Sequence, residues 1–182
     1  FAAMLVAHVQ NAANELAAGT TAPKPTAKAA PAPDYVARVY IAPLLKSSWN
    51  QCAPYNYYMP HNAKDPIPSV NKYRASTGCG TTAMAQVLNF YQWPPYGEGK
   101  MSHTDAQGKL QSSFETDFGH HYGWDLIKNS FDPNATGAGA QAVGQLCYDV
   151  AVAGRIDNEP GVSAINLNEA SNNFVNHMFY EA

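Results

Sequence analysis

The chain has 182 residues, a formal net charge of −3 and only 14% charged residues, so we expect one sizeable hydrophobic core. The mild negative charge argues against a nucleic-acid-binding surface, because phosphate recognition needs clustered lysine and arginine. No apolar run reaches the ~18–20 residues that span a bilayer. Low charge with abundant Asn, Gln, Ser, Thr and Tyr suits a bacterial protein that is secreted or lies at the cell surface or in the periplasm.

The first 40 residues divide into two segments. Residues 1–16 carry apolar side chains at spacings of four, three and four, from Leu5 to Leu16, which predicts an amphipathic helix. Residues 17–34 contain no aromatic and no large aliphatic side chain, which predicts an extended linker open to proteases. The chain begins at Phe1 and stops in an apolar, helix-like run, so we expect it to be a piece of a longer protein.

The main domain begins with an alternating segment, residues 36–45, that indicates a strand or an extended arm. The clearest helix lies between an expected N-cap at Ser76 or Thr77 and the stop signal Pro94-Pro95. Its predicted buried face comprises Ala83, Met84, Val87, Leu88 and Tyr91.

Two further helices follow. Residues 141–154 predict one, ending at Gly154, with a buried face of Val143, Leu146, Cys147, Val150 and Ala151. Residues 168–179 predict the other, whose apolar side chains are Phe174, Val175, Met178 and Phe179. Residues 96–123 indicate loop with a possible short strand, and residues 158–164 indicate a loop.

The cysteine count is odd. Cys52, Cys79 and Cys147 leave at least one free thiol in the monomer, and a disulfide between Cys52 and Cys147 is compatible with the count. There is no CxxC pair and no Cys/His cluster at zinc spacing, so we expect no structural metal site.

Cys79 lies where the clearest helix begins, with Gly78 and Gly80 on either side. The helix dipole and the open N–H groups at such a position favour a thiolate, which is the nucleophile of cysteine hydrolases. The flanking glycines let a substrate chain approach the backbone closely. Taken alone, however, a cysteine near a helix start is more often a buried structural thiol.

Two extended motifs in the expected order resemble the streptopain family of bacterial cysteine peptidases. Residues 43–60 contain PLL, WNQ, PYN and a closing proline, and residues 77–94 read TGCGTTAMAQVLNFYQWP. The resemblance implies a papain-like α+β fold with Cys79 as nucleophile and Gln51 as a side-chain donor to the oxyanion hole. It implies no cofactor and no metal. The family's Val-Ala pair after the cysteine is Gly80-Thr81 here, and Cys52 follows the glutamine where we expect a small neutral residue.

Weaker likenesses extend the resemblance over about residues 40–182. Residues 149–151 resemble a turn that ends the family's helix. The segment Gly161, Val162, Ser163 and Ala164 resembles a Gly-Ser-rich loop on the substrate side, so these residues, with Gly78 and Gly80, are the expected substrate-binding set. By the same resemblance, residues 1–16 are the last helix of an inhibitory propeptide, 17–40 the activation linker, and 41–182 the N-terminal part of the peptidase domain of a secreted zymogen that cuts proteins or peptides.

The catalytic base is not identified. A cysteine peptidase needs a histidine, ~130–150 residues after the cysteine in papain-like enzymes, and this chain ends 103 residues after Cys79. Solvated loop positions are expected for His61, His103, His120 and His121, and a partly buried helix position for His177. We therefore expect the base on a second chain or on a C-terminal half. Two alternatives stay open: a non-catalytic peptidase-like binding or inhibitor module, and an acyl-transfer enzyme of the transglutaminase type.

Overall fold

The computed structural model describes residues 42–61, 74–105, 113–159 and 162–181. The predicted helix over residues 1–16 and the linker over 17–40 lie outside these residues, as does most of the expected arm over 36–45, of which residues 42–45 form no strand. The chain separates into two units, and every helix and strand described below belongs to the one that contains Leu45–Ala182.

Helix α3, Ala138–Ala153, is the centre of this unit. The five apolar residues predicted for its buried face are all buried, and so are Val152 and Ala153. One side of α3 joins a core with Leu88 of α2 and with Phe174 and Met178 of α4. The other side joins a smaller core that includes Phe114 and Ile156. Because both sides of α3 are covered, most of its residues are apolar, and the sequence therefore predicts this helix clearly.

Helix α3 corrects one smaller expectation and confirms another. Asp149 lies inside the helix and is fully buried, so residues 149–151 are not a turn. Gly154 ends the helix, as predicted, with φ of −83°. Its role is close packing, because a Cβ at this position would lie 2.7 Å from the Cβ of Ile165.

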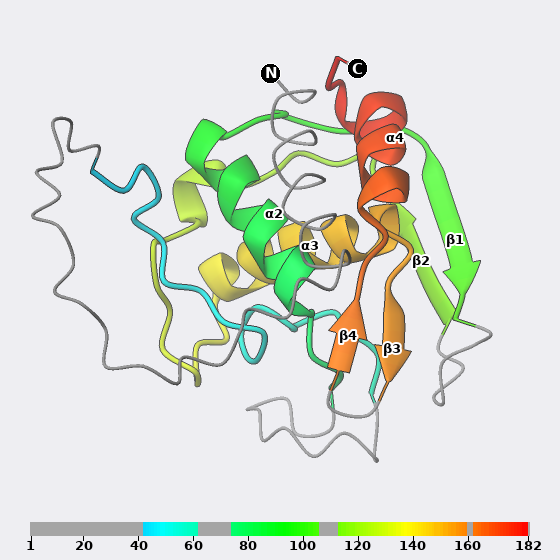
Figure 1. The fold of residues 1–182 in the computed structure, drawn as a ribbon. Helices are drawn as coiled ribbons and strands as arrows, with labels where there is room; N and C mark the ends of the chain where they lie inside the picture. Colours follow the sequence, from blue (N-terminus) through cyan, green and yellow to red (C-terminus); the bar gives the residue numbers. More distant parts are fainter. Residues whose placement is uncertain (1–41, 62–73, 106–112, 160–161, 182) are drawn as a thin grey trace, which may run out of the picture. The chain divides into compact units, whose positions relative to one another are not determined.

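Helix α2, Cys79–Tyr91, crosses α3 in Figure 1 and packs against it. The predicted buried face is confirmed at Leu88 and wrong at Ala83 and Tyr91. Thr81, Thr82, Ala85 and Leu88 are buried, whereas Ala83 and Tyr91 are exposed. A search for apolar residues does not find the two buried threonines, because their side chains are polar. Thr82 can be buried because its hydroxyl donates a hydrogen bond to the Gly78 carbonyl at 3.0 Å.

The predicted cap of α2 was also wrong. The N-cap is Gly78, and no side chain caps the helix. Gly78 has φ of +81°, and a Cβ there would collide with the carbonyl of Ser163. Glycine at this position therefore serves a left-handed conformation and a close approach at once.

Two antiparallel strand pairs lie in segments expected to be loop, the first of which was expected to hold a possible short strand. β1, Lys100–Thr104, pairs with β2, Ser113–Asp117, and β2 buries alternate residues, Phe114 and Thr116. β3, Asp157–Glu159, pairs with β4, Val162–Ala164, within the segment predicted to be a loop. Asn158 and Ser163 face each other across this second pair and are both buried, so its interior is polar and carries no apolar signal.

Helix α4, Leu167–Met178, begins at Asn166, whose side chain accepts hydrogen bonds from the backbone N–H groups of Asn168 and Glu169. Phe174 and Met178 are buried as predicted, whereas Phe179 is exposed and ends the helix in the left-handed conformation. No helix among the described residues is long and apolar enough to cross a bilayer.

Candidate active site

Cys79 is the first residue of α2, and its side chain is exposed. The expectation that it sits at a helix start is therefore confirmed, and the competing expectation of a buried structural thiol is not. The N-cap is a glycine, so no N-cap side chain accepts a hydrogen bond from the N–H groups of the first turn of α2. Those groups point toward any negative charge that develops beside Cys79.

Gln51 is tied to the segment that leads into Cys79. Its carbonyl accepts a hydrogen bond of 3.1 Å from the N–H of Thr77. The Thr77 hydroxyl lies 3.1 Å from the hydroxyl of Thr82, in the first turn of α2. The backbone of Gln51 is thus linked to α2 through Thr77, although 28 residues separate Gln51 from Cys79. Gln51 is partly exposed.

The β3–β4 pair borders the other side of the same segment. The Ser163 carbonyl packs against Gly78, and Ile165, just after β4, packs against Gly80, where a Cβ would lie 2.9 Å from its Cγ1. Figure 1 shows β4 beside the N-terminal end of α2. The structure therefore brings the predicted residues Gly78, Gly80 and Ser163 together.

The other members of the predicted substrate-binding set are placed only in part. Val162 and Ala164 lie in β4, and Ala164 is exposed. Gly161 lies outside the described residues. The Ser163 hydroxyl is buried and donates to Asn158 at 2.8 Å, so Ser163 would reach a substrate through its backbone and not through its hydroxyl.

The two remaining cysteines differ from Cys79. Cys147 is a fully buried free thiol in the core, so the disulfide considered between Cys52 and Cys147 does not form. Burial raises the pKa of the Cys147 thiol far above its ordinary value, with the nearby Asp149 as a second cause. Cys147 is therefore chemically inert as long as the core is folded.

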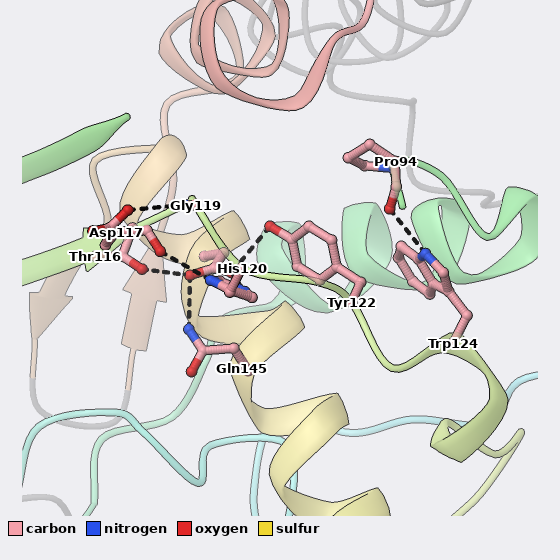
Figure 2. Close-up of polar contacts among 9 residues, drawn as sticks. Pro94, Thr116, Asp117, Gly119, His120, Tyr122, Trp124 and Gln145 are labelled. Carbon is pink, nitrogen blue, oxygen red and sulfur yellow. Dashed lines mark hydrogen bonds and ion pairs between the residues drawn. The ribbon is translucent and has the colours of Figure 1, made fainter. Parts of the chain in front are cut away.

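His120 corrects the expectation of a solvated loop histidine. Its Nδ1 lies 2.9 Å from the carbonyl of Asp117, and its Nε2 lies 3.0 Å from a carboxylate oxygen of the buried Asp149 (Figure 2). Both ring nitrogens therefore face oxygen acceptors. The distance from Nε2 to the Asp149 carboxylate lies within ion-pair range, so the geometry describes a His120–Asp149 ion pair when the imidazole is protonated.

The Asp149 carboxylate collects three more donors. Thr116 donates at 2.6 Å and Gln145 at 2.9 Å to one oxygen, and Tyr122 donates at 3.0 Å to the other. With His120, each oxygen receives two partners, which is what a buried carboxylate needs to stay charged. This Asp149 cluster joins α3, β2 and the segment that leads from β2 to η1, Trp124–Leu126.

Two further histidines contact backbone carbonyls, whereas His61 and His121 are exposed as expected. The Nε2 of His103, on β1, lies 3.0 Å from the Ile156 carbonyl, and its ring stacks on Phe114. The Nδ1 of His177, on α4, lies 2.9 Å from the Glu98 carbonyl. Position 177 is half-buried on a helix, as expected, whereas His103 is not a loop residue. Within the described part of the chain, no group of three or more His, Cys, Asp or Glu side chains is arranged to hold a metal ion.

The ion pair makes a prediction for stability against pH. The hydrogen bond to Asp149 raises the pKa of His120 above its ordinary value, partly opposed by burial. A raised folded-state pKa means that the stabilisation is complete below the unfolded-state value of about 6.5 and is lost as the pH rises through the folded-state pKa. The free energy of unfolding should therefore fall as the pH is raised from about 6.5.

Urea unfolding between pH 5 and pH 9 measures this effect. The variant His120→Gln should flatten the decline, because it removes the titrating partner of Asp149. The neighbouring His121 is a matched control, since its ring lies on the surface against Tyr96, and His121→Gln should retain the decline. An equally steep decline in His120→Gln would contradict the assignment.

Sequence reasoning missed both polar groups, the Asp149 cluster and the bonds around Ser163. Asp149 and Thr116 are 33 residues apart, and Ser76 and Ser163 are 87 apart. Single serines and threonines at such separations carry no local pattern. A buried aspartate inside an apolar helix face, here Asp149, was the one available signal that donors must be near.

The chain is similar to known proteins in sequence and in fold. Residues 49–182 match the sequence profile of the Peptidase C10 family. The thiol protease/hemagglutinin PrtT of Porphyromonas gingivalis is 26% identical over 118 residues, which cover 60% of this chain and 13% of PrtT.

Two solved structures are similar in fold. Active wild-type interpain A, a cysteine protease of Prevotella intermedia, has 28% sequence identity and a TM-score of 0.66 over 76% of this chain and 55% of that one. A fragment of prointerpain A from the same organism has 27% identity and a TM-score of 0.66 over 76% of this chain and 43% of that one. The chain thus spans about half the length of these structures and a small part of PrtT, and the predicted papain-like α+β class is confirmed.

Proposed function

Because the chain belongs to the Peptidase C10 family, the streptopain family of cysteine peptidases, we propose that it carries the nucleophile half of a cysteine endopeptidase. The observation that carries the proposal is the exposed thiol of Cys79 at the start of α2, where no side chain caps the helix. Two residues before Cys79, the N–H of Thr77 donates a hydrogen bond to the carbonyl of Gln51, which holds Gln51 beside this helix start. Protein and peptide chains are the substrates, and no cofactor takes part.

The proposed reaction has two steps. The Cys79 thiolate attacks the scissile carbonyl carbon, and the oxyanion that forms accepts hydrogen bonds from the Cys79 N–H and the Gln51 side chain. The C–N bond then breaks, and a histidine gives its proton to the leaving amine, which leaves a thioester on Cys79. Water attacks the thioester, gives a proton back to the histidine, and releases the carboxylic acid and the thiolate.

The histidine belongs, in this proposal, to polypeptide outside this chain. His103, His120 and His177 are already engaged with backbone carbonyls of Ile156, Asp117 and Glu98. Relatives of known structure extend well beyond the matched part. A second chain or a C-terminal half would therefore complete the site.

The proposed organisation is the one that the resemblance of the sequence to the streptopain family implies. Residues 1–16 form the last helix of an inhibitory propeptide, residues 17–40 form the linker cut on activation, and residues 41–182 form the N-terminal part of the peptidase domain. The similarity to a fragment of prointerpain A supports a zymogen. The low charge and polar composition support secretion or a place at the cell surface or in the periplasm.

Reconstitution tests the function. The purified chain is incubated with a fluorogenic peptide and with a primary amine, alone and with the C-terminal polypeptide of the longer protein. We expect hydrolysis only when both polypeptides are present. Amine incorporation without hydrolysis would indicate an acyl transferase, and a mixture without turnover and with an unreactive Cys79 would indicate a non-catalytic module; either result would overturn the proposal.

Gln51 has a quantitative prediction of its own. Replacing it with alanine removes one oxyanion donor and should lower kcat by about 10²–10³-fold, while KM changes little. The matched control is Gln86→Ala, which removes a glutamine amide from α2 itself, where it bonds Ser47 at 2.9 Å. Steady-state kinetics of both variants in the reconstituted enzyme decide the point, and equal losses in the two would argue against an oxyanion role.

A further inference from the structure

Residues 75–78, which lead into Cys79, run between two neighbouring segments. On one side, the N–H of Thr77 donates to the Gln51 carbonyl at 3.1 Å. On the other side, the Ser76 hydroxyl lies 3.2 Å from the hydroxyl of Ser163, and Gly78 packs against the Ser163 carbonyl. Ser76, through its hydroxyl, and Gly78, through its backbone, therefore both meet Ser163 of β4.

The hydrogen bonds around Ser163 have a defined direction. Its hydroxyl donates to the side-chain oxygen of Asn158 at 2.8 Å. A serine hydroxyl has one proton, so Ser76 must be the donor in the bond to Ser163. Asn158 also makes a second, separate hydrogen bond. Its backbone N–H donates at 3.0 Å to the carboxylate of Asp105, the residue that follows β1.

These groups are shielded from water. Ser76 is 1% exposed, Ser163 4% and Asn158 0%. A buried hydrogen bond cannot be exchanged for one to water without opening the structure, so it fixes the two segments more firmly than an exposed bond does. Neither serine lies in the apolar cores, so their burial contributes to position more than to hydrophobic stability.

We propose that Ser163 is a positioning residue for Cys79: through the Ser76 hydroxyl and the close contact with Gly78, it holds the turn from which α2 starts. The proposal rests on the proposed role of Cys79 as nucleophile. In this proposal the Ser163 hydroxyl supports the turn, and the backbone of β4 makes the contact with substrate. Losing this support lets the turn relax, so that the N–H groups at the start of α2, which stabilise nearby negative charge, no longer hold a fixed position beside Cys79.

Alkylation of the chain itself tests the proposal without any need for turnover. The native protein is treated with iodoacetamide at pH 7, and the labelling rate of each cysteine is followed by peptide mass spectrometry. In Ser163→Ala and Ser76→Ala, Cys79 should react about two- to fivefold more slowly than in the wild type, the range expected from losing a helix-terminus interaction. The double variant should react no more slowly than either single one, because both remove the same bond.

Cys147 and a second buried hydroxyl provide the controls. Because Cys147 is fully buried, it becomes labelled only when the domain opens, and its labelling should stay at the wild-type level in both serine variants. Thr116→Val removes a buried hydroxyl from the Asp149 cluster and should leave the Cys79 rate unchanged. An unchanged or faster Cys79 rate in Ser163→Ala, or slowing that appears only with labelling of Cys147, would overturn the proposal. Absent turnover in the reconstituted wild type, with slowed alkylation in the variants, would refute the peptidase function and not the positioning.

Discussion

Replacing Cys79 with alanine should abolish peptide hydrolysis, lowering kcat/KM by at least about 10⁴-fold, the scale seen when a hydrolase loses its nucleophile. The reason is chemical, because no other described cysteine combines full exposure with a helix start: Cys147 is buried and Cys52 is partly exposed in a turn. Steady-state kinetics on the reconstituted enzyme, with activity normalised to folded protein, measure the loss.

Two controls make this result specific. Cys52→Ala should keep near wild-type activity, because the proposed mechanism gives Cys52 no part in the chemistry. The free energy of unfolding of Cys79→Ala should stay close to that of the wild type, since the Cys79 side chain is exposed. Substantial activity in Cys79→Ala, or loss of activity in Cys52→Ala at unchanged stability, would exclude Cys79 as the nucleophile.

Replacing Asp149 with alanine should lower the free energy of unfolding by about 3–5 kcal/mol, the usual cost of breaking a buried ion pair from one side. The substitution leaves His120, Thr116, Tyr122 and Gln145 without their shared acceptor. Since small domains are stable by only about 5–15 kcal/mol, this change removes a large part of the total. Urea unfolding followed by tryptophan fluorescence measures it.

The surface offers a matched aspartate. Asp125, in η1, is exposed, and Asp125→Ala should change the free energy of unfolding by no more than about 0.5 kcal/mol. If Asp149→Ala does not fold, Asp149→Asn serves instead, because it keeps the shape of the side chain and one acceptor oxygen. The decrease in the free energy of unfolding should then be smaller but measurable. A loss in Asp149→Ala as small as that of Asp125→Ala would show that the cluster does not stabilise the domain.

Apolar periodicity predicted the helices whose buried positions are apolar and failed where they are polar. In α3, all five predicted core positions are buried, because the helix is enclosed on two sides by hydrocarbon. In α2, the buried residues near Cys79 are Thr81 and Thr82, so the same method found Leu88 but missed the two threonines. The pair β3–β4 escaped prediction for a related reason, because its two strands meet through Asn158 and Ser163.

The candidate site was predictable only where its residues lie in extended local motifs. The residue patterns around Gln51 and Cys79 identified the family, and the structure links the two through Thr77. Ser163 entered the predicted site by likeness of a loop, but its buried bonds to Ser76 and Asn158 depend on contacts between distant segments. Gly78 illustrates the same limit, because its positive φ and its contact with Ser163 become visible only in the fold.

Trapping the acyl intermediate tests the central claim most directly. The reconstituted enzyme is quenched in acid during turnover of a slowly hydrolysed peptide ester, digested, and examined by mass spectrometry for the acyl group. The account predicts one adduct, on Cys79, that hydroxylamine removes as it does any thioester, with no adduct on Cys52 or Cys147. An acyl group on another residue during turnover, or steady turnover with no acyl group on Cys79 under conditions where deacylation limits the rate, would contradict it.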